Sequence, residues 1–153
     1  MNNERTFIMI KPDGVQRGLV GRILRRFEDR GMKIVSMKLI RVTDALAKEQ
    51  YAEHLGKAFY PRLMAYIQSG PVVVAVIEAP DAVAQARKMV GATDPAKADV
   101  GTIRQKWGQD ISRNLIHASD SLQSAEREIA IYFKPEEILS YGLDVHKWLF
   151  APE

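Results

Sequence analysis

Residues 72–77, Val-Val-Val-Ala-Val-Ile, form an unbroken apolar run that restricts the possible folds more than any other stretch of the chain. A strand with one wet face alternates apolar and polar side chains, whereas an unbroken run is typical of a strand buried on both faces. The run is also far shorter than a membrane span. We therefore predict that these residues are the central strand of a sheet.

Weaker signals predict the elements around this strand. Further strands are expected where β-branched and aromatic residues gather, at 6–10, 32–42 and 130–133. Helices are expected where apolar residues recur at helical spacing between start and stop signals. In the first half of the chain, one helix is predicted over 19–30 and stops at Gly31, a second is capped by Thr43 and runs to about Leu55, and a third runs from Pro61 to Gly70. In the second of these, Tyr51, His54 and Leu55 are expected on one face. In the second half, one helix is capped by Asp81 and ended by Gly91, and shorter helical segments are predicted over 101–107, 122–129 and, as a single turn, 135–139.

The order of these elements is strand, helix, strand, helices, strand, helix and strand. The strands are too few and too mixed in type for a doubly wound parallel sheet. The order fits a split βαβ arrangement, which predicts an α+β protein with a ferredoxin-like α/β sandwich, a four-stranded antiparallel sheet and surrounding helices. Because no repeat or linker interrupts the chain, residues 1–153 are predicted to form a single domain.

Composition narrows the classes of function. The chain lacks cysteine, which excludes disulfide scaffolds, cysteine metal sites and thiol catalysis. The net charge of +3 suits a polyanionic ligand such as a nucleotide but is too small for a protein that coats DNA. The first residues lead straight into a predicted strand and do not resemble a signal peptide, so we expect a cytoplasmic protein without a membrane partner.

The octapeptide 114–121, Asn-Leu-Ile-His-Ala-Ser-Asp-Ser, is the strongest candidate for chemistry. It brings His117 to a turn of small polar residues that can start the next helix, and the free N–H groups of a helix start favour an anion. A neutral imidazole there could be a nucleophile towards phosphorus or an acyl carbon. From these residues alone, an ordinary histidine at the end of a strand, with a ring nitrogen bonded to the backbone, is the more common interpretation.

Other residues could bind an anion near that histidine. Lys11 stands at a predicted strand end, held by Pro12 and the turn that follows, and is either a solvated cap or a cation placed beside a ligand. The predicted loop 92–100 is flanked by Arg87 and Arg104, which could clamp phosphates or could simply be exposed arginines.

Four motifs in order make the chain resemble the nucleoside diphosphate kinase family. They are 5–15 (Arg-Thr-Phe-Ile-Met-Ile-Lys-Pro-Asp-Gly-Val), 69–73 (Ser-Gly-Pro-Val-Val), 101–104 (Gly-Thr-Ile-Arg) and 114–121, and the resemblance runs nearly end to end. It implies transfer of the γ-phosphate of a nucleoside triphosphate, chiefly ATP, to a nucleoside diphosphate. The family does this by a ping-pong route through phosphohistidine, with broad base specificity.

The resemblance also implies roles for individual residues. The implied catalytic residues are His117 as the nucleophile, Glu128 as the carboxylate that orients it, Ser119 beside it, Lys11 and Tyr51. The implied substrate-binding residues are Lys11, His54, Phe59, Arg87, Thr93, Arg104 and Asn114, with Phe59 stacking on the base and His54 the least secure of the set. Ala118 stands where the family most often has glycine, so we expect an ordinary backbone conformation there.

Cofactor and partners follow from the same resemblance. Mg²⁺ is expected, bound mainly through phosphate oxygens and water with no protein metal ligand. A homo-oligomer is expected, with a hexamer favoured over a tetramer and contacts from the loop near Pro95 and the apolar C-terminal tail. The competing classes are a non-catalytic nucleotide- or nucleic-acid-binding module and a subunit whose main role is assembly. Because no strand carries the paired aromatic residues of RNA-recognition domains, no nucleic-acid partner is expected.

Overall fold

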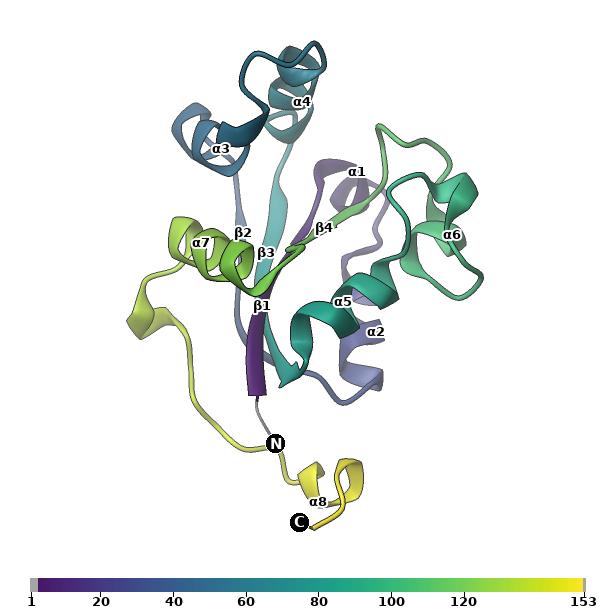
Figure 1. The fold of residues 1–153 in the computed structure, drawn as a ribbon, viewed down its shortest axis with the longest axis vertical. Coiled ribbons are helices and arrows are strands. Elements are labelled where there is room, and N and C mark those ends of the chain that lie inside the picture. Colours follow the sequence, from purple (N-terminus) through teal and green to yellow (C-terminus); the bar gives the residue numbers. More distant parts are fainter. Residues whose placement is uncertain (1–2, 153) are drawn as a thin grey trace.

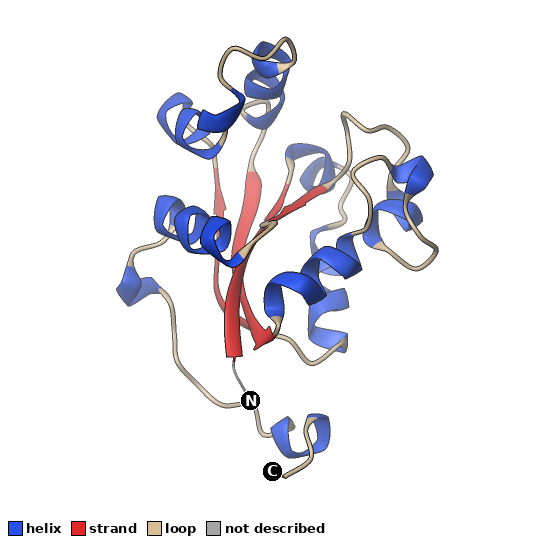
Figure 2. Ribbon diagram, in the orientation of Figure 1, coloured by secondary structure: helices blue, strands red, loops and turns tan. Residues whose placement is uncertain are grey.

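The computed structural model describes residues 3–152 and contains a four-stranded antiparallel sheet with strand order β2-β3-β1-β4 (Figures 1 and 2). The predicted fold class is confirmed. The strands are β1 (Asn3–Ile10), β2 (Lys33–Ile40), β3 (Val72–Pro80) and β4 (Ile116–Ala118).

The apolar run 72–77 lies in β3, which pairs with β1 on one side and β2 on the other. Its side chains alternate between two cores. One core contains Val73, Ala75 and Ile77, and the other contains Val72, Val74 and Val76. Both faces of the strand are therefore buried, which is why the sequence shows no polar alternation.

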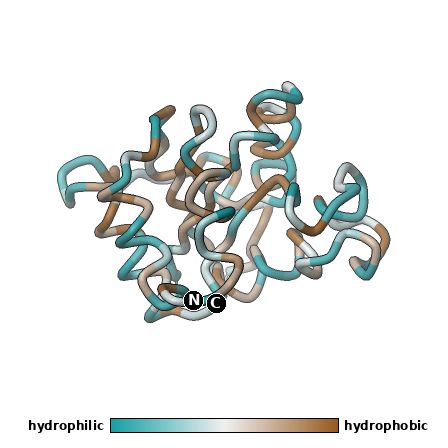
Figure 3. The backbone as a smooth tube through the Cα atoms, turned by 90° about the horizontal axis from the view of Figure 1, so that it is seen from above, coloured by the Kyte–Doolittle hydropathy of each residue, from teal (hydrophilic) through white to brown (hydrophobic). Residues whose placement is uncertain are grey.

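Helices cover both faces of the sheet (Figure 1). On one face, α2 (Val20–Asp29), α5 (Ala82–Val90) and α6 (Ile103–Trp107) contribute to the first core. On the other face, α3 (Asp44–Gln50), α4 (Tyr60–Ile67) and α7 (Leu122–Tyr132) contribute to the second. The shorter elements are α1 (Pro12–Gln16), α8 (His146–Leu149) and the 3₁₀ turns η1 (Ala52–His54), η2 (Pro95–Lys97) and η3 (Pro135–Glu137). Viewed from above, hydrophobic segments run through the middle of the fold (Figure 3).

Several predicted helix ends are confirmed in detail. The hydroxyl of Thr43 accepts a hydrogen bond from Leu46 N–H at the start of α3, and Ser121 does the same for α7. Gly31 follows the end of α2 with φ +84°, a conformation that glycine adopts readily. Asp81 does precede α5, but with φ +49° and no capping hydrogen bond from its side chain.

The predicted strand at 130–133 is wrong. Its residues continue α7 as far as Tyr132, and the fourth strand is β4 instead. Ala125, Glu128 and Tyr132 are all buried at spacings of three and four residues, so helical packing on the sheet overrides the local β propensity. Tyr132 stacks on Phe7 of β1, with ring centroids 5.1 Å apart.

Smaller boundary predictions also differ from the structure. The expected helix from Thr43 to Leu55 breaks after Gln50, so buried Tyr51 and exposed Leu55 do not share a face. The turn predicted over 11–14 is the start of a short helix, α1. Strand β2 is shorter than the predicted 32–42 and carries an irregularity between Ile34 and Ser36.

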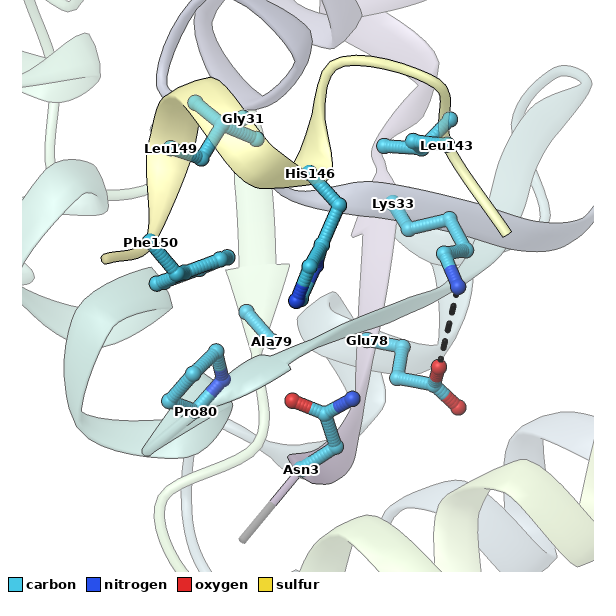
Figure 4. A pocket seen from close by; sticks show the side chains of 10 residues that line it. All are labelled: Asn3, Gly31, Lys33, Glu78, Ala79, Pro80, Leu143, His146, Leu149 and Phe150. Atoms are coloured by element: carbon cyan, nitrogen blue, oxygen red, sulfur yellow. Dashed lines mark ion pairs between the residues drawn. The ribbon is translucent and has the colours of Figure 1, made fainter. Parts of the chain in front are cut away.

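The C-terminal tail docks on the same chain, near the start of β1 (Figure 1). Leu149 of α8 packs where a side chain at Gly31 would stand, and His146 faces a small pocket beside Lys33 and Glu78 (Figure 4). Lys33 Nζ lies 3.5 Å from Glu78 Oε1. Within residues 3–152, none of the helices has the length and apolar character needed to cross a bilayer.

Candidate active site

His117 is the middle residue of β4 and lies opposite Met9 of β1. Its side chain is 24% exposed, and its ring centroid is 6.0 Å from that of Phe7. Backbone pairing and this aromatic contact fix the ring at the edge of the sheet while leaving part of it open to a ligand.

Glu128 lies on the buried face of α7 and binds the imidazole. Its Oε1 is 2.9 Å from His117 Nε2 and also accepts a hydrogen bond from the buried hydroxyl of Ser119. Its Oε2 accepts a 3.0 Å hydrogen bond from Gln50 Nε2, and Arg127 Nη2 lies 3.7 Å away. Both carboxylate oxygens are therefore held by neighbouring groups.

The ionisation of Glu128 decides which ring nitrogen of His117 carries the proton. Burial opposes ionisation of Glu128, but the hydrogen bond and charge of His117, the hydrogen bond from Ser119 and the charge of Arg127 outweigh it and lower the pKa of Glu128. A carboxylate can only accept, so Nε2 of a neutral His117 carries the proton. Nδ1 then carries the lone pair, and no group within residues 3–152 hydrogen-bonds to it.

The segment before His117 has an unusual backbone. Leu115 has φ +77°, rare for a non-glycine residue, and Ile116 N–H donates to Asn114 O at 2.9 Å across it. These two features define a tight γ-turn centred on Leu115. Ala118 is absent from the residues with positive φ, so the expected ordinary conformation there is confirmed.

Lys11 is tied to this turn at both ends. Its backbone N–H donates to Leu115 O at 2.8 Å, and its Nζ donates to Asn114 Oδ1 at 2.8 Å. Burial, and then the charge of Arg104, lower the pKa of Lys11 to about 8, although the charge of Asp13 acts in the opposite direction. Lys11 is thus a partly desolvated cation at the turn that precedes the candidate nucleophile.

Arg104 is a built-in part of the site rather than an exposed arginine. It is 4% exposed, and its guanidinium donates to the carbonyl oxygens of Gly91, Asn114 and Ile116 at 2.9, 3.3 and 2.6 Å. These contacts use three of its five N–H donors and leave two without a partner among residues 3–152. Burial, with the charge of Arg87, lowers the pKa of Arg104 to about 10.

The two arginines come together because α5 and α6 approach closely. Gly91 ends α5 with φ +90°, and a Cβ there would lie 2.5 Å from Thr102 Oγ1, so only glycine fits. Arg87 Nη1 lies 3.3 Å from Ala118 O, and Thr93 O accepts a 3.1 Å hydrogen bond from Asn114 Nδ2. The predicted phosphate-side residues therefore converge on the segment that carries His117.

The remaining predicted residues form an aromatic row. Ring centroids are 6.2 Å apart for Tyr51 and His54, and 5.3 Å apart for His54 and Phe59. Tyr51 is buried, and burial together with the charge of Glu128 raises its pKa, whereas Phe59 is 44% exposed. The exposed ring of Phe59 offers a flat surface for stacking.

Two contacts of this site could not be predicted from the sequence. Gln50 binds Glu128 from 78 residues away, and Asp13 binds Leu115 N–H at 3.1 Å from 102 residues away. Asp13 carried only a turn signal, and nothing in the local pattern marked Gln50.

Comparisons with known proteins agree with this geometry. The family model described as nucleoside diphosphate kinase matches residues 4–138. The chain is similar to the nucleoside diphosphate kinase of Pelotomaculum thermopropionicum, with 57% identity over 147 residues covering 96% of this chain and 99% of that protein. It is likewise similar to the enzyme of Gloeobacter violaceus, with 55% identity and the same coverage.

Solved structures give the same result. A nucleoside diphosphate kinase from Halobacterium salinarum in complex with CDP superposes with a TM-score of 0.95 at 46% identity, covering 97% of this chain and 99% of that one. The family model, the relatives and the solved structure each match nearly the whole length of this chain. The chain therefore belongs to the nucleoside diphosphate kinase family of enzymes.

Proposed function

We propose that this enzyme transfers the γ-phosphate of a nucleoside triphosphate, chiefly ATP, to a nucleoside diphosphate through a phosphorylated Nδ1 of His117. One observation carries the proposal. Glu128 Oε1 lies 2.9 Å from Nε2, which makes Nδ1 the nitrogen with the available lone pair.

The phosphoryl group is transferred in two steps, first to His117 and then to the second nucleotide. The Nδ1 lone pair attacks the γ-phosphorus, the bond to the β,γ-bridging oxygen breaks, and its electron pair leaves with the diphosphate. A terminal oxygen of the second diphosphate then attacks the same phosphorus, and the electrons of the N–P bond return to Nδ1. The ionised Glu128 stabilises the positive ring that forms in the first step.

Cationic side chains would neutralise part of the phosphate charge. A triphosphate carries about four negative charges near neutral pH, and phosphoryl transfer depends on positioning and charge neutralisation. Lys11, Arg87 and Arg104 all bind the segment 114–118 that carries His117. We infer that they bind the phosphates there, with Thr93 contributing its hydroxyl.

Mg²⁺ is the proposed cofactor. Among residues 3–152, no three His, Cys, Asp or Glu side chains gather closely enough to hold a metal ion. The ion would therefore be bound by phosphate oxygens and water, as is common for Mg²⁺. It would supply further neutralisation of the phosphate charge.

The nucleoside would lie along the aromatic row. Phe59 is exposed enough to stack on a base, and stacking tolerates every base because each has a π-face. We infer that Lys11 and Asn114 bind the ribose hydroxyl, with His54 and Tyr51 between the phosphates and the base. The CDP-bound relative supports nucleotide binding by this fold.

We further propose a homo-oligomer, with a hexamer favoured over a tetramer, that acts in the cytoplasm. Strand β2 lies at the edge of the sheet, and its side chains Met37 and Leu39 are 58% and 67% exposed. An edge strand that carries exposed apolar side chains favours pairing with another chain.

The phosphohistidine is tested by labelling. Enzyme incubated with ATP labelled at the γ-phosphate should take up about one phosphoryl group per chain, stable in alkali and lost in acid, at His117. The variant His117→Gln should take up none and should not exchange phosphate between nucleotides. An active His117→Gln variant would refute the proposed role.

A further inference from the structure

The turn centred on Leu115 is held by hydrogen bonds on every side. Lys11 N–H donates to Leu115 O, and Arg104 donates to the carbonyl oxygens on either side of it, those of Asn114 and Ile116. The positive φ of +77° at Leu115 costs energy for a residue with a side chain, so surrounding contacts must maintain it.

Asp13 makes the remaining contact. Its Oδ2 accepts a 3.1 Å hydrogen bond from Leu115 N–H, and its Oδ1 accepts a hydrogen bond from the hydroxyl of Tyr66. The hydroxyl comes from the 8% exposed Tyr66 of α4, so Asp13 links α1, α4 and the turn before His117.

The backbone beside Asp13 leaves little room for adjustment. A Cβ at Gly14 would lie 2.7 Å from Ile10 Cγ2 and 3.1 Å from Leu115 O, so α1 and the turn are in close contact. The segment 11–14 therefore binds both the N–H and the carbonyl oxygen of Leu115. A shift of α1 would move the turn with it.

We propose that Asp13 is a positioning residue for phosphoryl transfer: by accepting the Leu115 N–H, it holds the turn that directs Asn114 to Lys11 and leads the chain into β4 at His117. This inference rests on the proposed function. Asp13 has no contact with the imidazole, and it acts through the backbone of Leu115.

Position and charge can be separated by two conservative variants. Asp13→Asn keeps an acceptor in place for Leu115 N–H, and its amide N–H can donate to the hydroxyl oxygen of Tyr66, but the charge is lost. Asp13→Glu keeps the charge but moves the acceptor by about one bond length, and misplacement on the order of 1 Å can cost about 100-fold in rate. Asp13→Ala removes both properties.

The test is single-turnover phosphorylation of His117 at a series of ATP concentrations, which gives a maximal rate and an apparent dissociation constant. We expect the maximal rate of Asp13→Asn to stay within about threefold of the unmodified enzyme. We expect Asp13→Glu and Asp13→Ala to lose about 10- to 100-fold, in the range found for groups that orient functional side chains. The dissociation constant should change much less than the rate.

Asp44→Asn and Asp44→Glu are the matched controls, because Asp44 is exposed on α3 and, among residues 3–152, pairs only with nearby Lys48 and Gln68. Both should react at the unmodified rate. Should Asp13→Ala fail to fold, the contrast between Asp13→Asn and Asp13→Glu decides the matter. Retained activity in Asp13→Glu, or equal loss in Asp13→Asn and Asp13→Glu, overturns the inference. An unmodified enzyme that takes no label on His117 would instead refute the proposed function.

Discussion

His117 Nε2 lies 2.9 Å from Oε1 of Glu128, a carboxylate whose side chain is only 5% exposed. A buried carboxylate at this distance both selects the tautomer of the imidazole and stabilises its positive charge when phosphorus bonds to the other nitrogen. The negative charge, rather than the shape of Glu128, should therefore matter most for the rate.

Glu128→Gln isolates that charge. The Oε1 of Gln50 has no hydrogen-bond partner among the described residues, so the Gln50 amide can rotate until this oxygen accepts from the new amide of residue 128, and the packing is preserved. We expect the rate of His117 phosphorylation to fall about 10- to 100-fold with little change in nucleotide affinity. Stopped-flow or quench measurements on the variant would check this, and an unchanged rate would contradict the role of the charge.

Ser119→Ala should make stability less dependent on pH. The lowered pKa of Glu128 means that the ionised form stabilises the fold above the unfolded value of about 4.5, and that this contribution is lost as pH falls through the lower folded value. Without the Ser119 hydrogen bond, the folded pKa rises towards the unfolded one. In urea titrations, the variant should therefore be less stable at pH 7, by about 1–2 kcal/mol, and approach the unmodified enzyme in acid.

The lowered pKa of Lys11 predicts that activity falls at alkaline pH. Because burial lowers its pKa to about 8, the free enzyme should lose the cation, and with it kcat/KM, above that pH. Bound phosphates favour the charged form, so the corresponding limb of kcat should lie at higher pH. In Lys11→Arg the limb of kcat/KM near pH 8 should disappear, even if the activity is lower, because a guanidinium keeps its proton. A limb that persists in this variant would assign it to another group.

Much of the fold could be predicted because local signals and packing agree. The run 72–77 is apolar on both faces and is central, and Thr43 and Ser121 begin helices as their hydroxyls suggest. The strand predicted at 130–133 is wrong because packing on the sheet, through buried Glu128 and Tyr132, makes these residues continue a helix. Local propensity is a weak guide where tertiary contacts dominate.

The site, too, could be predicted from the sequence only in part. The motif around His117 and the resemblance it carries identified the residues that converge there, but their environments are set by distant parts of the chain. Arg104 could have been an exposed arginine until the carbonyl groups around it were known. Asp13 and Gln50 are ordinary polar residues locally, and only the fold brings them to Leu115 and Glu128.

The edge strand β2 provides a test of assembly. Leu39 is 67% exposed on this edge, and a lysine there would place a charge where a second chain would pair, which native proteins use to prevent association. We expect Leu39→Lys to have a smaller molar mass than the unmodified enzyme in size-exclusion chromatography with light scattering. Ala84→Lys, on the exposed side of α5, adds the same charge away from the edge and should leave the mass unchanged. If Leu39→Lys keeps the mass of an oligomeric unmodified enzyme, association uses another surface, and the docked C-terminal tail becomes the next region to alter.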